Sequence, residues 1–152
     1  MKDSYIKIKK IPYEEPYHLN LIFSASNGLF CGHLDFYCSV DDIKRLGKVL
    51  SIFPREASDE YIYKIGSPNP KNNCAYFFQL RAYTINMIGH CALQIRINNN
   101  EEKADEGACR FSIKVEPTEL NRLGELLLTF SKLRHKELNW SLSGDLDSLI
   151  EE

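Results

Sequence analysis

The chain of 152 residues carries one strand–helix pattern twice, in residues 34–53 and again in residues 111–130. In each copy, apolar and polar residues first alternate, as in a half-buried strand, and apolar residues then recur at helical spacing. The matched pairs are Leu34 and Phe111, Phe36 and Ile113, Ile43 and Leu120, Leu46 and Leu123, Gly47 and Gly124, Leu50 and Leu127, and Phe53 and Phe130. The repeat predicts two equivalent units whose shared positions are core, cap and close-packing positions.

Alternating segments elsewhere predict four further strands, at residues 18–24, 60–65, 76–84 and 88–97. With the two repeat units they give the element order ββα-ββββα, in which hairpin connections dominate. We therefore expect an α+β protein with a mainly antiparallel six-stranded sheet, both helices packed on one face and the other face open. Residues 1–152 are expected to form a single α+β domain that contains the pseudo-repeat. The tail from Trp140 is expected to hold one short turn.

Asn27-Gly28 predicts a tight hairpin, since both central residues of a type I′ turn need a positive φ. A two-residue loop at this position places Leu21 opposite Leu34 on the neighbouring strand. Apolar residues then share one face of the pair, as a half-buried antiparallel sheet requires.

The ends of both helices have recognisable signals. Ser39 followed by Asp42 forms a capping box, which predicts that the first helix begins after Ser39, and Pro54 ends it. Pro117 suits the first turn of the second helix.

Composition indicates an ordinary globular chain. The formal net charge is −2, which does not by itself point to nucleic acid or a membrane. The first residues lack the apolar core of a signal peptide, so we expect a cytoplasmic protein without a membrane partner. The five cysteines show no Cys-x-x-Cys spacing and are expected to be reduced, buried thiols that act as small hydrophobes: Cys31, Cys38, Cys74, Cys91 and Cys109.

The open face of the expected sheet is the candidate interface. Alternation places on it Arg81, Arg96, Arg110 and Lys114, against the single acid Asp35. The residues predicted to bind a partner there are Arg81, Tyr83, Arg96, His33 and Tyr37. The alternatives are a solvated face of cross-strand polar pairs and a nucleic-acid platform. Nucleic acid is the less favoured ligand because no aromatic-rich binding signature is present.

The connection between residues 98 and 107 is acidic. Glu101, Glu102 and Asp105 are also predicted to bind a partner, because complementary charge there would speed association with a basic protein. The alternative is a solvated loop without a partner.

No catalytic or metal motif stands out. Cys31, His33 and Asp35 can share a strand face, but alternate residues lie roughly 6–7 Å apart, beyond the reach of a catalytic hydrogen bond. Adjacent residues such as His90 and Cys91 point to opposite faces of a strand and cannot easily bind one metal ion. We therefore expect no enzymatic activity, no metal and no cofactor.

Three stretches carry a family resemblance: Gly32 to Pro54, the strand Gly89-His90-Cys91-Ala92-Leu93-Gln94-Ile95, and Phe111 to Phe130 with Val115-Glu116-Pro117. Together they resemble small cytosolic bacterial α+β proteins, mostly uncharacterised, that include immunity-type proteins of polymorphic toxin systems. The resemblance covers about two thirds of the chain and implies a toxin domain as the protein partner.

The sequence therefore predicts a non-enzymatic protein-binding domain of the immunity type that neutralises a toxin. The alternative is a small-molecule or nucleic-acid binding module that uses the open sheet face. A homodimer, in which a second copy of the chain is the partner, is a further alternative.

Overall fold

The computed structural model describes residues 3–152. Its strands are β1 (Tyr5–Pro12), β2 (His18–Ser26), β3 (Cys31–Ser39), β4 (Glu60–Gly66), β5 (Phe77–Thr84), β6 (Cys91–Asn98), β7 (Ala108–Val115), β8 (His135–Ser141) and β9 (Ser148–Glu151). The helices are α1 (Val40–Ser51) and α2 (Pro117–Phe130), and the two short 3₁₀ turns are η1 (Pro70–Asn72) and η2 (Lys103–Asp105).

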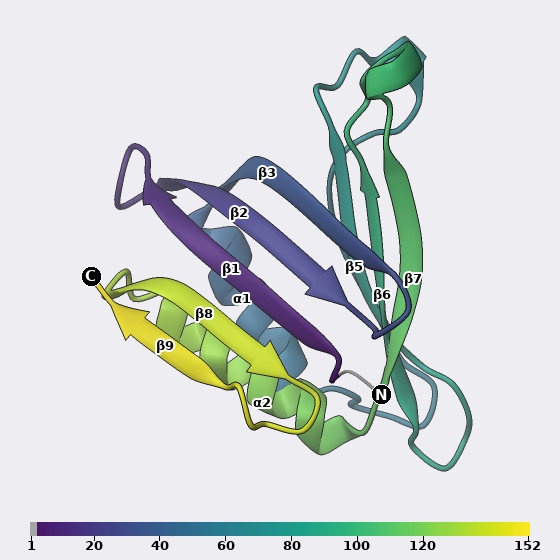
Figure 1. Ribbon diagram of the computed structural model, residues 1–152. Coiled ribbons are helices and arrows are strands. Elements are labelled where there is room, and N and C mark those ends of the chain that lie inside the picture. The colour runs from purple at the N-terminus through teal and green to yellow at the C-terminus, as the bar shows by residue number, and fades with distance from the viewer. Residues whose placement is uncertain (1–2) are drawn as a thin grey trace.

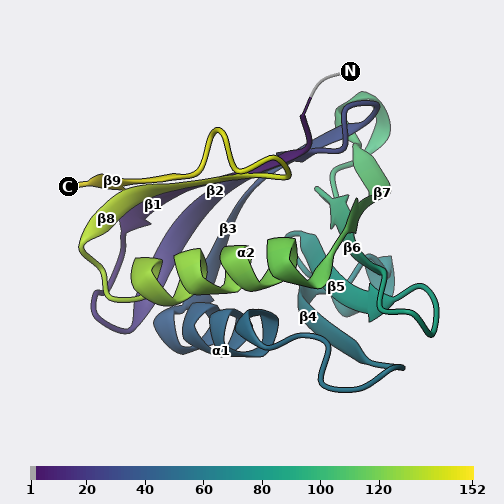
Figure 2. The same cartoon turned by 90° about the horizontal axis from the view of Figure 1, so that it is seen from below.

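The strands form two antiparallel sheets instead of one (Figure 1). The five-stranded sheet has the order β3-β2-β1-β8-β9, and the four-stranded sheet has the order β4-β5-β6-β7. Both helices lie on the same side of the five-stranded sheet (Figure 2). The α+β class and the antiparallel pairing are confirmed, whereas the prediction of a single six-stranded sheet is wrong.

Two parts of the five-stranded sheet were missed by the sequence patterns. In β1, Ile6 and Ile8 are buried, but lysines lie between and after them, so the sequence of this segment resembles a charged, exposed segment. The tail was expected to hold one short turn, yet it forms β8 and β9, with Leu138 and Trp140 fully buried. β8 pairs with β1, so each of these strands has one neighbour that lies far away in the chain.

The repeat extends well beyond the strand–helix units. The chain is two consecutive β-β-β-α-β units, β1-β2-β3-α1-β4 and β5-β6-β7-α2-β8, followed by β9. Each unit gives its first three strands to one sheet and its last strand to the other. Thus β4 pairs with β5 of the second unit, and β8 pairs with β1 of the first.

The two sheets also share one register. In the five-stranded sheet, one row of directly opposed residues is Leu138, Ile8, Phe23 and Leu34. The row at the equivalent positions of the four-stranded sheet is Tyr63, Leu80, Ile95 and Phe111. All eight side chains are buried, so the repeat is a repeat of the core.

The hairpin between β2 and β3 has a longer loop than predicted. Leu21 lies opposite Phe36, not Leu34, and Ser26 lies opposite Cys31. The predicted register was wrong because Asn27 closes a four-residue loop, in which its side chain accepts hydrogen bonds from the backbone N–H groups of Leu29 and Phe30. A shift of two residues leaves every side chain on its predicted face.

Both helix starts agree with the sequence signals. The Ser39 hydroxyl accepts a hydrogen bond from the Asp42 backbone N–H at 3.1 Å, which confirms the capping box, and α2 begins at Pro117. The end of α1 is capped by α2, because the Asn121 side-chain amide donates to the carbonyl oxygens of Leu50 and Phe53 at 2.9 and 3.0 Å.

The buried apolar residues of both sheets and both helices form one continuous core. Phe78 of the four-stranded sheet joins the two sheets, since its ring stacks on Phe36 with a centroid distance of 4.5 Å and meets Phe23 edge-on at 4.8 Å.

The two helices cross at a pair of glycines. A Cβ atom on Gly124 would lie 2.7 Å from the Leu50 carbonyl carbon and still closer to the Ser51 backbone nitrogen. A Cβ on Gly47 would lie 2.9 Å from the Leu128 backbone nitrogen and 3.0 Å from the Gly124 oxygen. Backbone therefore packs on backbone, which explains why this glycine recurs in both copies of the repeat.

Replacing Gly124 with alanine is expected to lower the free energy of unfolding by about 2–3 kcal/mol, because the new methyl group meets main-chain atoms that can move only if the helices separate. Helix propensity alone would give the opposite sign, a gain of about 1 kcal/mol. Chemical denaturation measures the difference. Gly107→Ala is the control, since its Cβ would meet only the Asn99 side chain, at 3.3 Å, and an equal effect in both variants would contradict the close-packing role.

Cleavage between the two units should leave the molecule assembled. A protease site placed in the connection after η1 would cut the chain into halves that each contribute strands to both sheets. We expect the halves to co-elute as one complex in native size-exclusion chromatography and to separate in concentrated urea. Separation under native conditions would contradict the exchange of final strands.

Candidate functional site

The predicted open face is divided between two separate surfaces. His33 and Tyr37 lie on the outer face of the five-stranded sheet, whereas Arg81, Tyr83 and Arg96 lie on the outer face of the four-stranded sheet. The acidic residues Glu101, Glu102 and Asp105 lie in the β6–β7 connection, at one end of the four-stranded sheet (Figure 1). The assumption of one shared face was wrong because the strands belong to two sheets.

Polar groups on the outer face of the five-stranded sheet bind one another. The Ser24 hydroxyl lies 2.9 Å from Nδ1 of His33, and the Asn20 amide donates to Asp35. Lys7 forms an ion pair with Glu137 at 3.0 Å. This arrangement is that of a solvated face whose cross-strand pairs satisfy each other.

The outer face of the four-stranded sheet is different, because its cations are mostly unpaired. We call it the basic face and define it by Lys64, Arg81, Arg96, Arg110 and Lys114. Arg81 binds the carboxylate of Glu60 at 2.6 Å and lies 4.1 Å from the centre of the Tyr83 ring. Within residues 3–152, the other four cations of this face form no ion pair.

Lys64 was missed by the sequence analysis. It lies directly opposite Gln79, which in turn lies opposite Arg96, so it extends the basic face across β4. The strand was predicted, but nothing in the sequence showed that it pairs with β5.

The two ends of the basic face have contrasting loops. The β5–β6 connection presents an apolar tip, in which Met87 and Ile88 are 77% and 80% exposed and Ile85 is 47% exposed. The β6–β7 connection lies at the other end of the sheet (Figure 1). It forms the acidic loop, whose residues Glu101, Glu102, Asp105 and Glu106 are exposed. The surface thus offers apolar, cationic and anionic parts in that order.

Two adjacent hollows lie where the basic face meets the acidic loop. One, of about 260 Å³, is lined by Phe77, Arg96 and Arg110 among others. The second, of about 780 Å³, is lined by Glu101, Glu102 and Glu106 among others. The hollows share Pro68, Asn98 and Ala108 in their linings, so groups of opposite charge stand close together.

The residues considered for nucleophilic chemistry form no hydrogen bonds with one another, and most of them form hydrogen bonds with other groups. His33 and Asp35 make their hydrogen bonds to β2, and Cys31 of the same strand is exposed. Nδ1 of His90 lies within hydrogen-bond distance of the Glu116 carboxylate, at 2.7 Å, and the buried Cys91 thiol donates to the Gly89 carbonyl. The described part of the chain contains no group of three or more His, Cys, Asp or Glu residues placed to hold a metal ion.

All five cysteines are free thiols, but only two are buried. Burial raises the pKa of the Cys38 thiol to about 12, and nearby Asp42 adds to the shift. Cys31 is exposed, and Cys74 and Cys109 are partly exposed, so the prediction of buried thiols holds only for Cys38 and Cys91.

A buried lysine joins the C-terminal residues to the core. The Lys10 ammonium group is fully buried and binds Glu15 at 2.9 Å, Glu152, and the carbonyl oxygen of Leu133 at 3.3 Å. Burial lowers the pKa of Lys10, but hydrogen bonds with Glu152 and Glu15 outweigh this effect and raise the pKa overall. Since its three donors are used, this group supports the fold.

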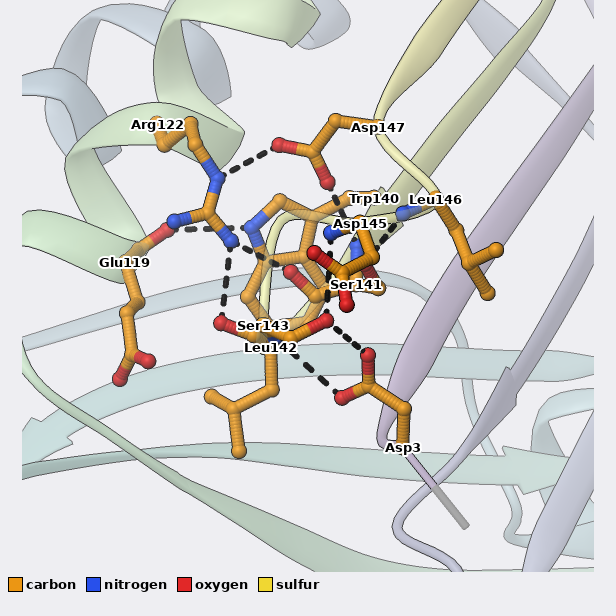
Figure 3. A network of polar contacts seen from close by, with 10 residues as sticks. All are labelled: Asp3, Glu119, Arg122, Trp140, Ser141, Leu142, Ser143, Asp145, Leu146 and Asp147. Carbon is orange, nitrogen blue, oxygen red and sulfur yellow. Dashed lines mark hydrogen bonds and ion pairs between the residues drawn. The ribbon is translucent and has the colours of Figure 1, made fainter.

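A polar network around Arg122 links α2 to the β8–β9 connection (Figure 3). Arg122 binds Asp147 at 2.5 Å and donates to the carbonyl oxygens of Ser141 and Leu142. Asp147 accepts the Ser141 backbone N–H at 2.8 Å, and the buried Trp140 indole donates to the Glu119 carbonyl at 3.1 Å. The network satisfies its own groups, so we assign it a structural role.

Comparison of the chain with protein-family models, with curated proteins and with solved structures finds no significant match. Within residues 3–152, neither α1 nor α2 combines the length and the apolar character that crossing a membrane needs. The function is therefore inferred from the geometry of the surface, in which the basic face and its two flanking loops form the candidate site.

The pseudo-repeat supplies a matched control for the role of Arg122. Arg122→Met should lower the free energy of unfolding by about 2 kcal/mol, because Asp147 and two carbonyl groups lose a charged donor. The equivalent residue of α1 is Arg45, which is exposed, and Arg45→Met should change stability little. Equal effects in urea denaturation would contradict a structural network.

Proposed function

We propose that the chain is a non-catalytic protein-binding domain whose partner docks an acidic patch on the basic face. The observation that carries the proposal is the set of cations Lys64, Arg96, Arg110 and Lys114, which have no carboxylate partner in the described residues. Unpaired like charges on one sheet face repel each other, and a complementary partner removes this cost.

The flanking loops favour a protein over a nucleic acid. A polyanion that ran along the sheet would meet the carboxylates of the acidic loop, whereas a folded protein can match both signs of charge. The exposed Met87 and Ile88 offer apolar anchors of the kind that protein interfaces bury at their centres.

An immunity-type role is the specific form of this proposal suggested by the resemblance in the sequence. In that form the partner is a toxin domain with an acidic patch, and the acidic loop binds basic residues at the edge of that patch. Binding would block the toxin by covering it, so no catalytic group of the chain is required.

The test is affinity purification of the tagged chain from the cells that produce it, followed by identification and quantification of bound proteins. We expect one stoichiometric protein partner, and we expect Lys64→Glu/Lys114→Glu to weaken its binding by at least about tenfold through charge repulsion. Raised salt should weaken the wild-type complex, because the attraction is between exposed charges.

The control variant is Lys9→Glu/Lys44→Glu, which makes the same change in net charge on other exposed surfaces. Circular dichroism of both variants confirms folding. Equal loss of binding in both variants would overturn the proposed interface. Capture of nucleic acid alone, or of further copies of this chain alone, would overturn the proposed partner.

A further inference from the structure

The smaller of the two hollows lies on the basic face and contains two arginines. Its lining includes Pro68 from the loop after β4, Phe77 of β5, Arg96 of β6 and Arg110 of β7. We infer that this hollow is a carboxylate-binding subsite, which takes one Asp or Glu side chain of the partner. The partner is that of the proposed function, while the subsite itself is defined by the residues of this chain.

Arg96 and Arg110 are directly opposed across two neighbouring strands. Like charges at such positions destabilise a sheet, and no carboxylate of the described residues neutralises either group. Two guanidinium groups that converge on one hollow can together bind both oxygens of a carboxylate.

The pseudo-repeat shows that the fold does not need this pair. The equivalent positions of the five-stranded sheet are Ser24 and His33, which are also directly opposed and lie within hydrogen-bond distance, at 2.9 Å. One sheet thus has a hydrogen-bonded pair, and the other has two cations without a carboxylate partner in the described residues. The arginines are therefore explained by a ligand and not by the architecture.

The Phe77 ring is part of the lining of the hollow. It lies on the outer face of the sheet, and only 4% of its surface is accessible. The Arg96 guanidinium lies 5.2 Å from the centre of this ring, a cation–π contact that holds the charged group in place before a ligand arrives. A preorganised donor loses less conformational entropy on binding.

The size and lining favour a carboxylate side chain. A volume of about 260 Å³ is below the range of pockets for drug-sized ligands, roughly 300–1,000 Å³. Phe77, Pro68 and Ala108 give apolar walls that the methylene groups of Glu can contact, whereas a phosphate would leave them unused. The adjacent carboxylates of the acidic loop disfavour ligands with several negative charges.

The test is a titration of the ¹⁵N-labelled protein, monitored through the Arg Nε–Hε and backbone amide signals. The probe is N-acetyl-glutamate methylamide, with N-acetyl-glutamine methylamide as its neutral counterpart and inorganic phosphate as the competing oxyanion. We expect saturable shifts at Arg96 and Arg110 with the glutamate probe in the millimolar range. Arg96→Gln and Arg110→Gln should each weaken this binding by about tenfold.

Two further variants make the result decisive. Lys9→Gln, on the other sheet, should leave the titration unchanged, and Arg96→Ser/Arg110→His, which copies the pair of the five-stranded sheet, should fold but lose binding. Equal shifts with the glutamine probe, or linear shifts that never saturate, would overturn the subsite, and tighter binding of phosphate would overturn its assignment to carboxylates. Saturable binding without any protein partner would leave the subsite standing and remove only the proposed function.

Discussion

The contact between Gly47 and Gly124 is the constraint on which the rest of the structure depends. It lets the backbones of α1 and α2 meet at equivalent positions of the two units. Asn121 strengthens the same contact, because its amide caps the end of the neighbouring helix. The helices are packed together at this point. The last strand of each unit pairs with the sheet of the other unit, so neither sheet is complete without both halves of the chain.

The core obeys the pseudo-symmetry, whereas the surface does not. Equivalent rows such as Ile8 and Leu80, or Phe23 and Ile95, are apolar in both sheets because both face the same continuous core. The outer faces have no such shared requirement. The five-stranded sheet pairs most of its polar groups internally, whereas the four-stranded sheet presents cations and carries an apolar loop and an acidic loop at its ends. It is therefore the face on which we propose that a partner binds.

Local patterns predicted the helices and their caps well, because a capping box, a proline and an apolar stripe act within a few residues. They failed where a strand depends on a distant partner. In β1, lysines mask the alternation of apolar and polar residues. The sequence of β8 resembles a polar tail, but in the structure Trp140 is buried and its indole donates a hydrogen bond to α2. The prediction of the candidate site was incomplete for the same reason. Arg96 and Arg110 were correctly placed on one face, but Lys64 was missed. His33 and Tyr37 were assigned to the same face as the arginines, whereas they lie on the other sheet.

The sequence by itself determined which side is buried in β2, β3, β5, β6 and β7, where both helices begin, and that one strand–helix unit occurs twice. These features depend on periodicity and on hydrogen bonds between near neighbours. Only the tertiary structure decided that the strands divide into two sheets, that the final strands are exchanged, and which charged residues share a surface. These outcomes depend on which strands pair. Pairing depends on contacts between residues far apart in the chain, for which no local pattern exists.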